Sequence, residues 1–91
     1  MSNYSYPLNE DWSSQEIAIV VEFLAAVESA YETGIKVVRI KDKYRAFKEI
    51  VNSISEEKQI DRKFQTASGY SIYQCMQKAK TLKESQTLKM P

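Results

Sequence analysis

The longest apolar stretch of the chain runs from Trp12 to Gly34, and it carries a helix signal at each end. Ser13 and Glu16 have the spacing of a capping box, in which each side chain binds a backbone amide that the first turn leaves unpaired. Gly34 can adopt the positive φ with which many helices end. The stretch therefore predicts one long helix that begins at Ser14 and ends near Thr33.

Apolar residues cover more than half of the circumference of this predicted helix. A surface helix that packs against one neighbour needs only a narrow stripe, so two interpretations remain. The first places the helix at the centre of the domain, where the apolar stripes of later segments cover it. The second uses part of its face, including Ile19, Phe23 and Ala26, for contact with a second copy of the chain.

The segment after Gly34 carries two conflicting signals. The β-branched residues of 35–40 favour a strand by themselves. Residues 37, 40, 44, 47 and 51 are apolar or aromatic and follow the 3, 4, 3, 4 spacing of one helix face. Because a strand here has no evident partner elsewhere in the sequence, we predict a helix over about 37–51.

Two shorter helices are predicted further along the chain. One runs over about 54–66 after the capping pair Ser53 and Glu56. The other begins at residue 72, after a turn at Gly69, and runs to about residue 83. The expected inward residues are Ile60, Phe64 and Ala67 in the first helix, and Ile72, Tyr73, Met76 and Ala79 in the second, with Cys75 at the margin.

The two ends of the chain lack helical periodicity. Residues 1–11 are predicted to form an extended arm, because Pro7 disfavours helix at Tyr6. The arm can lay Tyr4, Leu8 and the neighbouring Trp12 across the helices, and residues 84–91 are predicted to be a frayed tail. The chain is thus predicted to be one all-α domain over 1–91, a small irregular bundle of about four helices with an extended N-terminal arm.

Charge is divided unevenly along the chain. Residues 1–34 contain six acidic residues and no Lys or Arg, whereas all thirteen basic residues follow Gly34. The first interpretation is that an acidic first helix packs beside basic later helices. The second is that the basic part faces an anionic partner such as RNA, through Lys41, Arg45 and Lys48 or Lys36, Arg39 and Lys43 on the second helix, and Lys78, Lys80 and Lys83 on the fourth.

The composition argues against an enzyme. The chain contains no histidine, which is the commonest general base and metal ligand. Its two glycines cannot form a glycine-rich phosphate loop, and Cys75 has no histidine to activate it. We therefore expect no catalytic residues, no cofactor and no metal. A single cysteine and the lack of a long apolar run or apolar leader favour a cytoplasmic protein that does not enter a membrane.

One surface combines charged and aromatic residues near the two short turns. We predict that Lys48, Glu57, Lys58, Tyr70 and Tyr73 converge there. The function predicted from this surface is non-enzymatic binding of a protein partner or of a second copy. RNA binding through the basic helix faces is the alternative.

Several short motifs between Tyr6 and Tyr73 resemble those of one known family. They are Tyr6-Pro7-Leu8 with Asp11-Trp12, Tyr44-Arg45 with Phe47-Lys48 and Ile50-Val51, Glu56-Glu57-Lys58, Phe64, and Ser68-Gly69-Tyr70-Ser71 with Tyr73. In these motifs the chain resembles uncharacterised protein family 0223, the YktA-like small proteins of low-GC Gram-positive bacteria. It departs from the family pattern at Val51-Asn52, where members commonly have Val-Pro, and at Val37-Val38-Arg39, where they are acidic. The resemblance implies an all-helical cytoplasmic domain and supplies neither an activity nor site residues.

Overall fold

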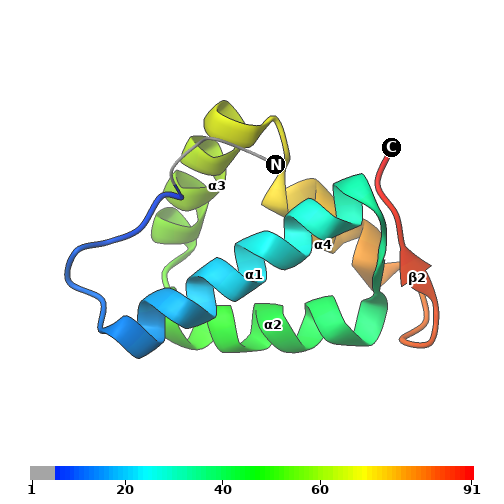
Figure 1. Cartoon of the computed structure of the whole chain (residues 1–91), viewed down its shortest axis with the longest axis horizontal. Helices are drawn as coiled ribbons and strands as arrows, with labels where there is room; N and C mark the ends of the chain where they lie inside the picture. The colour runs from blue at the N-terminus through cyan, green and yellow to red at the C-terminus, as the bar shows by residue number, and fades with distance from the viewer. Residues whose placement is uncertain (1–5) are drawn as a thin grey trace.

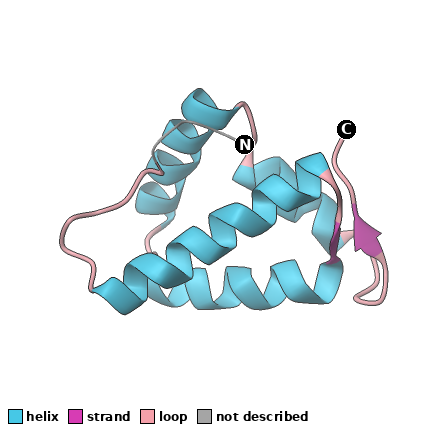
Figure 2. Cartoon of the chain, viewed as in Figure 1, coloured by secondary structure: helices cyan, strands magenta, loops and turns pink. Residues whose placement is uncertain are grey.

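The structure is a computed structural model that describes residues 6–91. Within this range the chain forms four helices and one two-stranded antiparallel ribbon (Figures 1 and 2). The elements in chain order are α1 Ser14–Glu32, β1 Ile35–Lys36, α2 Val37–Ile50, α3 Ile54–Ser68, α4 Ile72–Lys80 and β2 Thr87–Leu88. The predicted all-α fold is confirmed, and the expected fourth helix is about one turn shorter than predicted.

Helix α1 has the ends that the sequence predicts. The Ser13 hydroxyl accepts a hydrogen bond from the Glu16 amide at 3.1 Å, and the Glu16 carboxylate accepts one from the Ser13 amide at 2.8 Å. Gly34, just beyond the helix, has φ +98°. Both ends are therefore fixed by residues within the helix and its flanks.

The core is built around α1, which packs at an inclination against α2 and also contacts α4 and β1 (Figure 1). The Phe23 ring lies 4.6 Å from the Phe47 ring and 5.4 Å from the Tyr44 ring, measured between centroids. Phe23 and Ala26 are buried and Ile19 is partly buried. These findings favour the central position for α1, because other segments of the same chain cover Phe23 and Ala26 and partly cover Ile19.

The N-terminal arm packs on the helices over its described part. Tyr6 and Trp12 both lie against the core, and the Tyr6 hydroxyl donates a hydrogen bond to Glu28 at 2.7 Å. The Tyr6 ring lies 6.3 Å from the ring of Phe64 in α3. Tyr4, which was expected to join this packing, lies outside the described residues.

The prediction of a frayed tail is wrong. Residues 87–88 form β2, which pairs with β1 in the register Ile35 with Leu88 and Lys36 with Thr87. Leu88 is fully buried and Met90 nearly so. The β-branched signal before α2 was thus correct for its first two residues, and the partner strand lies at the far end of the chain.

Backbone groups of the tail also complete the start of α2. Lys36 at the N-cap makes no side-chain hydrogen bond to the helix. Instead, the amides of Val37 and Val38 donate to the carbonyls of Gln86 and Glu84 at 2.9 and 3.2 Å. Since the first amides of a helix have no partner within it, the tail takes the place of a capping side chain.

Candidate interaction groove between α3 and α4

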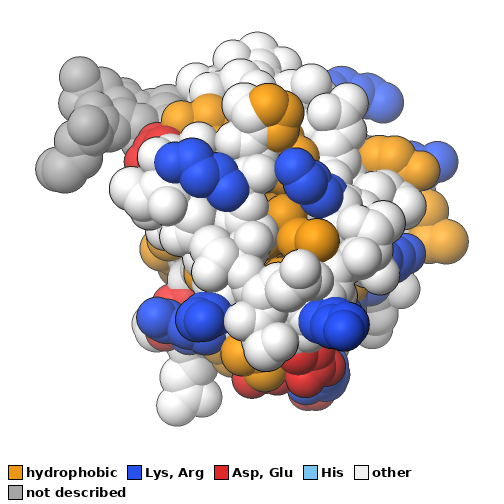
Figure 3. All heavy atoms as spheres, turned by 90° about the vertical axis from the view of Figure 1, so that its right-hand side faces the viewer, with side chains coloured by type: hydrophobic (Ala, Val, Ile, Leu, Met, Phe, Trp, Pro, Cys, Tyr) orange, Lys and Arg blue, Asp and Glu red, His pale blue; other side chains and the backbone are white. Residues whose placement is uncertain are grey.

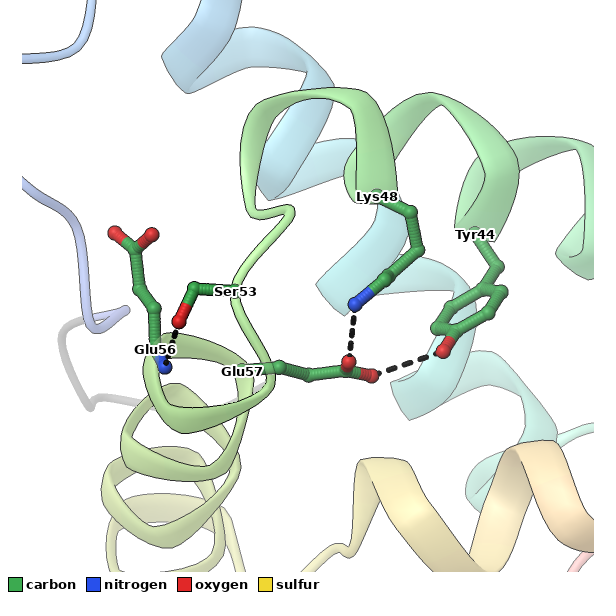
Figure 4. Close-up of polar contacts among 5 residues, drawn as sticks. All are labelled: Tyr44, Lys48, Ser53, Glu56 and Glu57. Atoms are coloured by element: carbon green, nitrogen blue, oxygen red, sulfur yellow. Dashed lines mark hydrogen bonds and ion pairs between the residues drawn. The ribbon is translucent and has the colours of Figure 1, made fainter.

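The partly buried carboxylate of Glu57 joins α3 to α2. With Tyr44 and Lys48 it forms what we call the Glu57 cluster. The Lys48 ammonium lies 2.5 Å from one oxygen of Glu57, and the Tyr44 hydroxyl donates to the other at 2.9 Å (Figure 4). Ser53 caps α3 through the amide of Glu56, whose own carboxylate points away from the cluster (Figure 4). The two adjacent glutamates therefore do not form a convergent pair of carboxylates.

The Glu57 cluster changes the pKa of the Tyr44 phenol. Burial and the hydrogen bond to the Glu57 carboxylate raise the pKa of this phenol to about 12. Both oxygens of Glu57 have a donor on α2, so this carboxylate links α3 to α2.

A second carboxylate, that of Asp61, sets the rotation of α4 about its own axis. Asp61 of α3 accepts hydrogen bonds from the backbone amides of Ile72 and Tyr73 at 2.8 and 3.2 Å, and Ser71 caps the same helix end. In this orientation Cys75 is fully buried and Tyr73 is 64% exposed. The prediction of an inward Tyr73 and a marginal Cys75 is therefore wrong, and so is that of an inward Ala67, which is exposed.

The rotation opens a groove between α3 and α4 that reaches α2, with a volume of about 220 Å³. Tyr44, Ile72 and Met76 supply its more buried lining. Ile54, at the start of α3, and Tyr73 line the same groove and are 69% and 64% exposed. These are the two most exposed large hydrophobic side chains in the described part of the chain.

The charge along the groove is positive. Lys58 and Lys80 line it beside Glu57, whose charge is balanced by Lys48. Three ion pairs are present within residues 6–91: Lys43–Glu22, Arg45–Asp42 and Lys48–Glu57. Neither Lys58 nor Lys80 takes part in them, so the groove presents apolar side chains flanked by two cations without an acidic partner among these residues.

Comparison with known proteins identifies the family of the chain. The model of the uncharacterised protein family UPF0223 matches residues 3–88. The chain belongs to this family. UPF0223 proteins of Listeria monocytogenes serovar 1/2a, Listeria innocua serovar 6a and Listeria welshimeri serovar 6b are each 51% identical over 88 residues, which cover 97% of this chain and 98% of theirs. The predicted resemblance is confirmed, and the names of these relatives carry no activity.

Four of the five predicted site residues of this UPF0223 chain come together. Lys48 contacts Glu57, and Glu57, Lys58 and Tyr73 line the groove. Tyr70 does not line it: its ring stacks on Tyr31 at 4.5 Å, and its hydroxyl donates to Glu32 at 2.8 Å. Tyr70, in the turn before α4, therefore packs on α1, whereas Tyr73, in the first turn of α4, lines the groove. Ile54, Met76 and Lys80 also line the groove, although none of the three was predicted to be part of this surface.

A second hollow, of about 520 Å³, lies between α1 and the start of α2. Arg39 and Lys43 line it, and Lys43 is paired with Glu22 at 2.6 Å. Figure 3 shows the face that carries β2, on which basic side chains are spread out with apolar and uncharged surface between them. The basic residues there do not form a continuous stripe.

Three further features of residues 6–91 concern the free thiol, metal binding and membrane spans. Burial raises the pKa of the Cys75 thiol to about 12, which keeps it protonated at neutral pH. The described residues include no group of three or more acidic and cysteine side chains that could hold a metal ion. Among the described helices, none combines the length and the apolar character required to cross a bilayer.

Proposed function

We propose that this UPF0223 protein is a cytoplasmic, non-enzymatic protein-interaction domain that binds its partner in the groove between α3 and α4. The observation that carries the proposal is the position of Ile54 and Tyr73. Isolated exposed apolar residues are ordinary, but these two side chains line one groove together with the buried Met76.

The energetics of the groove favour a binding surface. Covering an Ile or Tyr side chain that is about two-thirds exposed, as Ile54 and Tyr73 are, contributes about 1–2 kcal/mol for each residue. The groove lining is held in place by the Glu57 cluster on one side and the Asp61 cap on the other. A partner therefore pays little to organise this surface, which favours binding.

The carboxylates in and beside the groove are already bound to partners within the described residues, and this supports the non-enzymatic proposal. Glu57 accepts hydrogen bonds from the side chains of Tyr44 and Lys48. Asp61 accepts hydrogen bonds from two backbone amides at the start of α4. The free thiol of Cys75 is buried and its pKa is raised. A free, buried cysteine also accords with a reducing compartment.

The alternative, RNA binding through the basic faces of α2 and α4, has weaker support. The ammonium groups of Lys36 and Lys78 lie within hydrogen-bond distance of the tail carbonyls of Ser85 and Lys89, at 3.4 and 3.2 Å. The Tyr70 ring is already stacked on a tyrosine of α1. RNA binding predicts an affinity that falls steeply with salt, so a mobility shift at two salt concentrations tests it.

Site-specific photocrosslinking in the native host tests the proposed function. A photoreactive residue at position 73 lies in the groove, and one at position 38 is the matched control, because Val38 is also an exposed apolar residue but lies outside the groove. We expect a discrete adduct from position 73 that is absent from position 38. Equal adducts from both positions, or none from 73, contradict the proposal.

A further inference from the structure

The chain itself carries a segment with the chemistry that the groove between α3 and α4 lacks. In the described arm, Leu8 is 40% exposed, and Glu10 and Asp11 are exposed without an ion-pair partner within residues 6–91. We call residues 8–11 the acidic corner. It offers one apolar side chain and two carboxylates, and the groove offers apolar side chains and two unpaired lysines.

The acidic corner is held in shape. The amide of Leu8 donates to the Tyr6 carbonyl at 2.9 Å, and the amide of Trp12 donates to the Asn9 carbonyl at 3.1 Å. The Asn9 side chain accepts from the Asp11 amide at 2.9 Å. Tyr6 and Trp12 anchor both ends of the corner on the core, so little order needs to be gained on binding.

One chain cannot bring its own corner to its own groove. The corner lies with Pro7 and Trp12 beside the face of α3 that carries Gln59 and Lys63. The groove uses the face that carries Ile54 and Lys58. At about 100° per residue these two faces are on opposite sides of α3. Since the arm is anchored, only another copy can supply a corner to the groove.

We propose that the occupant of the groove is the acidic corner of a second copy, in a two-fold symmetric dimer. This inference rests on the groove of the proposed function and names its partner. A two-fold axis parallel to α3 places the corner of each copy opposite the groove of the other, so both contacts form at once and the assembly closes. Leu8 then covers Ile54 and Tyr73, and Glu10 and Asp11 approach Lys58 and Lys80.

Sedimentation equilibrium with charge-reversed variants tests this dimer. The groove variant is Lys58→Glu with Lys80→Glu, and the corner variant is Glu10→Lys with Asp11→Lys. We expect the wild-type chain to dimerise. Each variant alone should associate at least about tenfold more weakly, because attractive charge pairs become repulsive. An equimolar mixture of the two variants regains the dimer, since each groove then meets a corner of opposite charge.

The controls separate this inference from the proposed function. Arg39→Glu with Lys89→Glu makes the same charge change outside the groove and leaves the dimer intact, and circular dichroism checks that every variant is folded. A monomeric wild-type chain, or a dimer that ignores both reversals or is not regained on mixing, overturns the inference. If position 73 still crosslinks a different protein in that case, the proposed function stands and only the self-association fails.

Discussion

Replacement of Leu88 by alanine tests the docking of the C-terminal tail. The Leu88 side chain is fully buried, and its strand pairs with Ile35. A Leu→Ala change at a buried site removes the transfer free energy of the lost methyl groups and leaves a cavity, at about 3 kcal/mol. For a domain of this size we expect the free energy of unfolding to fall by that amount and the melting temperature by about 12–24 °C.

Urea unfolding followed by helical circular dichroism measures this loss. The matched control is Lys89→Ala, one residue further along, where the side chain is exposed. We expect the control to change the free energy of unfolding by less than about 0.5 kcal/mol. If Leu88→Ala costs no more than the control, the tail is not docked in solution and the reasoning from its burial is refuted.

Three further predictions concern single groups. Tyr44→Phe should flatten the loss of stability at high pH, because stability that depends on a phenol with a pKa raised from 10.0 to about 12 is fully present below pH 10 and is lost as the pH rises through 12; urea midpoints across this window measure it, and an unchanged slope contradicts it. Gly34→Ala should destabilise more than Gly69→Ala, because both have positive φ, but a Cβ at 34 would lie 3.2 Å from Thr87 Cγ2 whereas one at 69 meets nothing within 4 Å; thermal melts compare them, and equal losses speak against tail contact at 34. The Cys75 thiol should react with a disulfide reagent at a rate set by opening of the fold; fast labelling in native buffer would show that it is not buried.

Local signals predicted the helices well. The capping box of α1 involves residues three positions apart, and the apolar spacing of α2 repeats within single turns. Such signals need no knowledge of the tertiary fold. The starts of α1, α3 and α4, which have side-chain caps, were therefore placed correctly from the sequence, whereas that of α2, which has none, was predicted only approximately.

Features that depend on distant residues were missed. The rotation of α4 about its axis, which exposes Tyr73 and buries Cys75, is set by Asp61. This carboxylate accepts hydrogen bonds from backbone amides 11 and 12 residues further along the chain. The strand at Ile35 needs Leu88, at the other end of the chain. Periodicity within one segment cannot specify which neighbour fixes its rotation or supplies its pair.

The candidate site was predicted in part for the same reason. Charged and aromatic residues near the turns suggested the correct region, and Lys58 and Tyr73 line the groove there. The sequence did not reveal that Lys48 and Glu57 bind each other, nor that Tyr70 stacks on α1. Ile54 was missed because a residue in the first turn of a helix shows no periodic signal of its own.

The tail carbonyls at the start of α2 have a consequence for the order of folding. Most contacts of the bundle join neighbouring helices and can form early, whereas the bonds from Val37 to Gln86 and from Val38 to Glu84 close a loop of about fifty residues. Tail docking is then a late step, so substitutions there should accelerate unfolding far more than they slow refolding. The lifetime of the native state is thereby controlled by residues 84–88, the part of the chain that docks last.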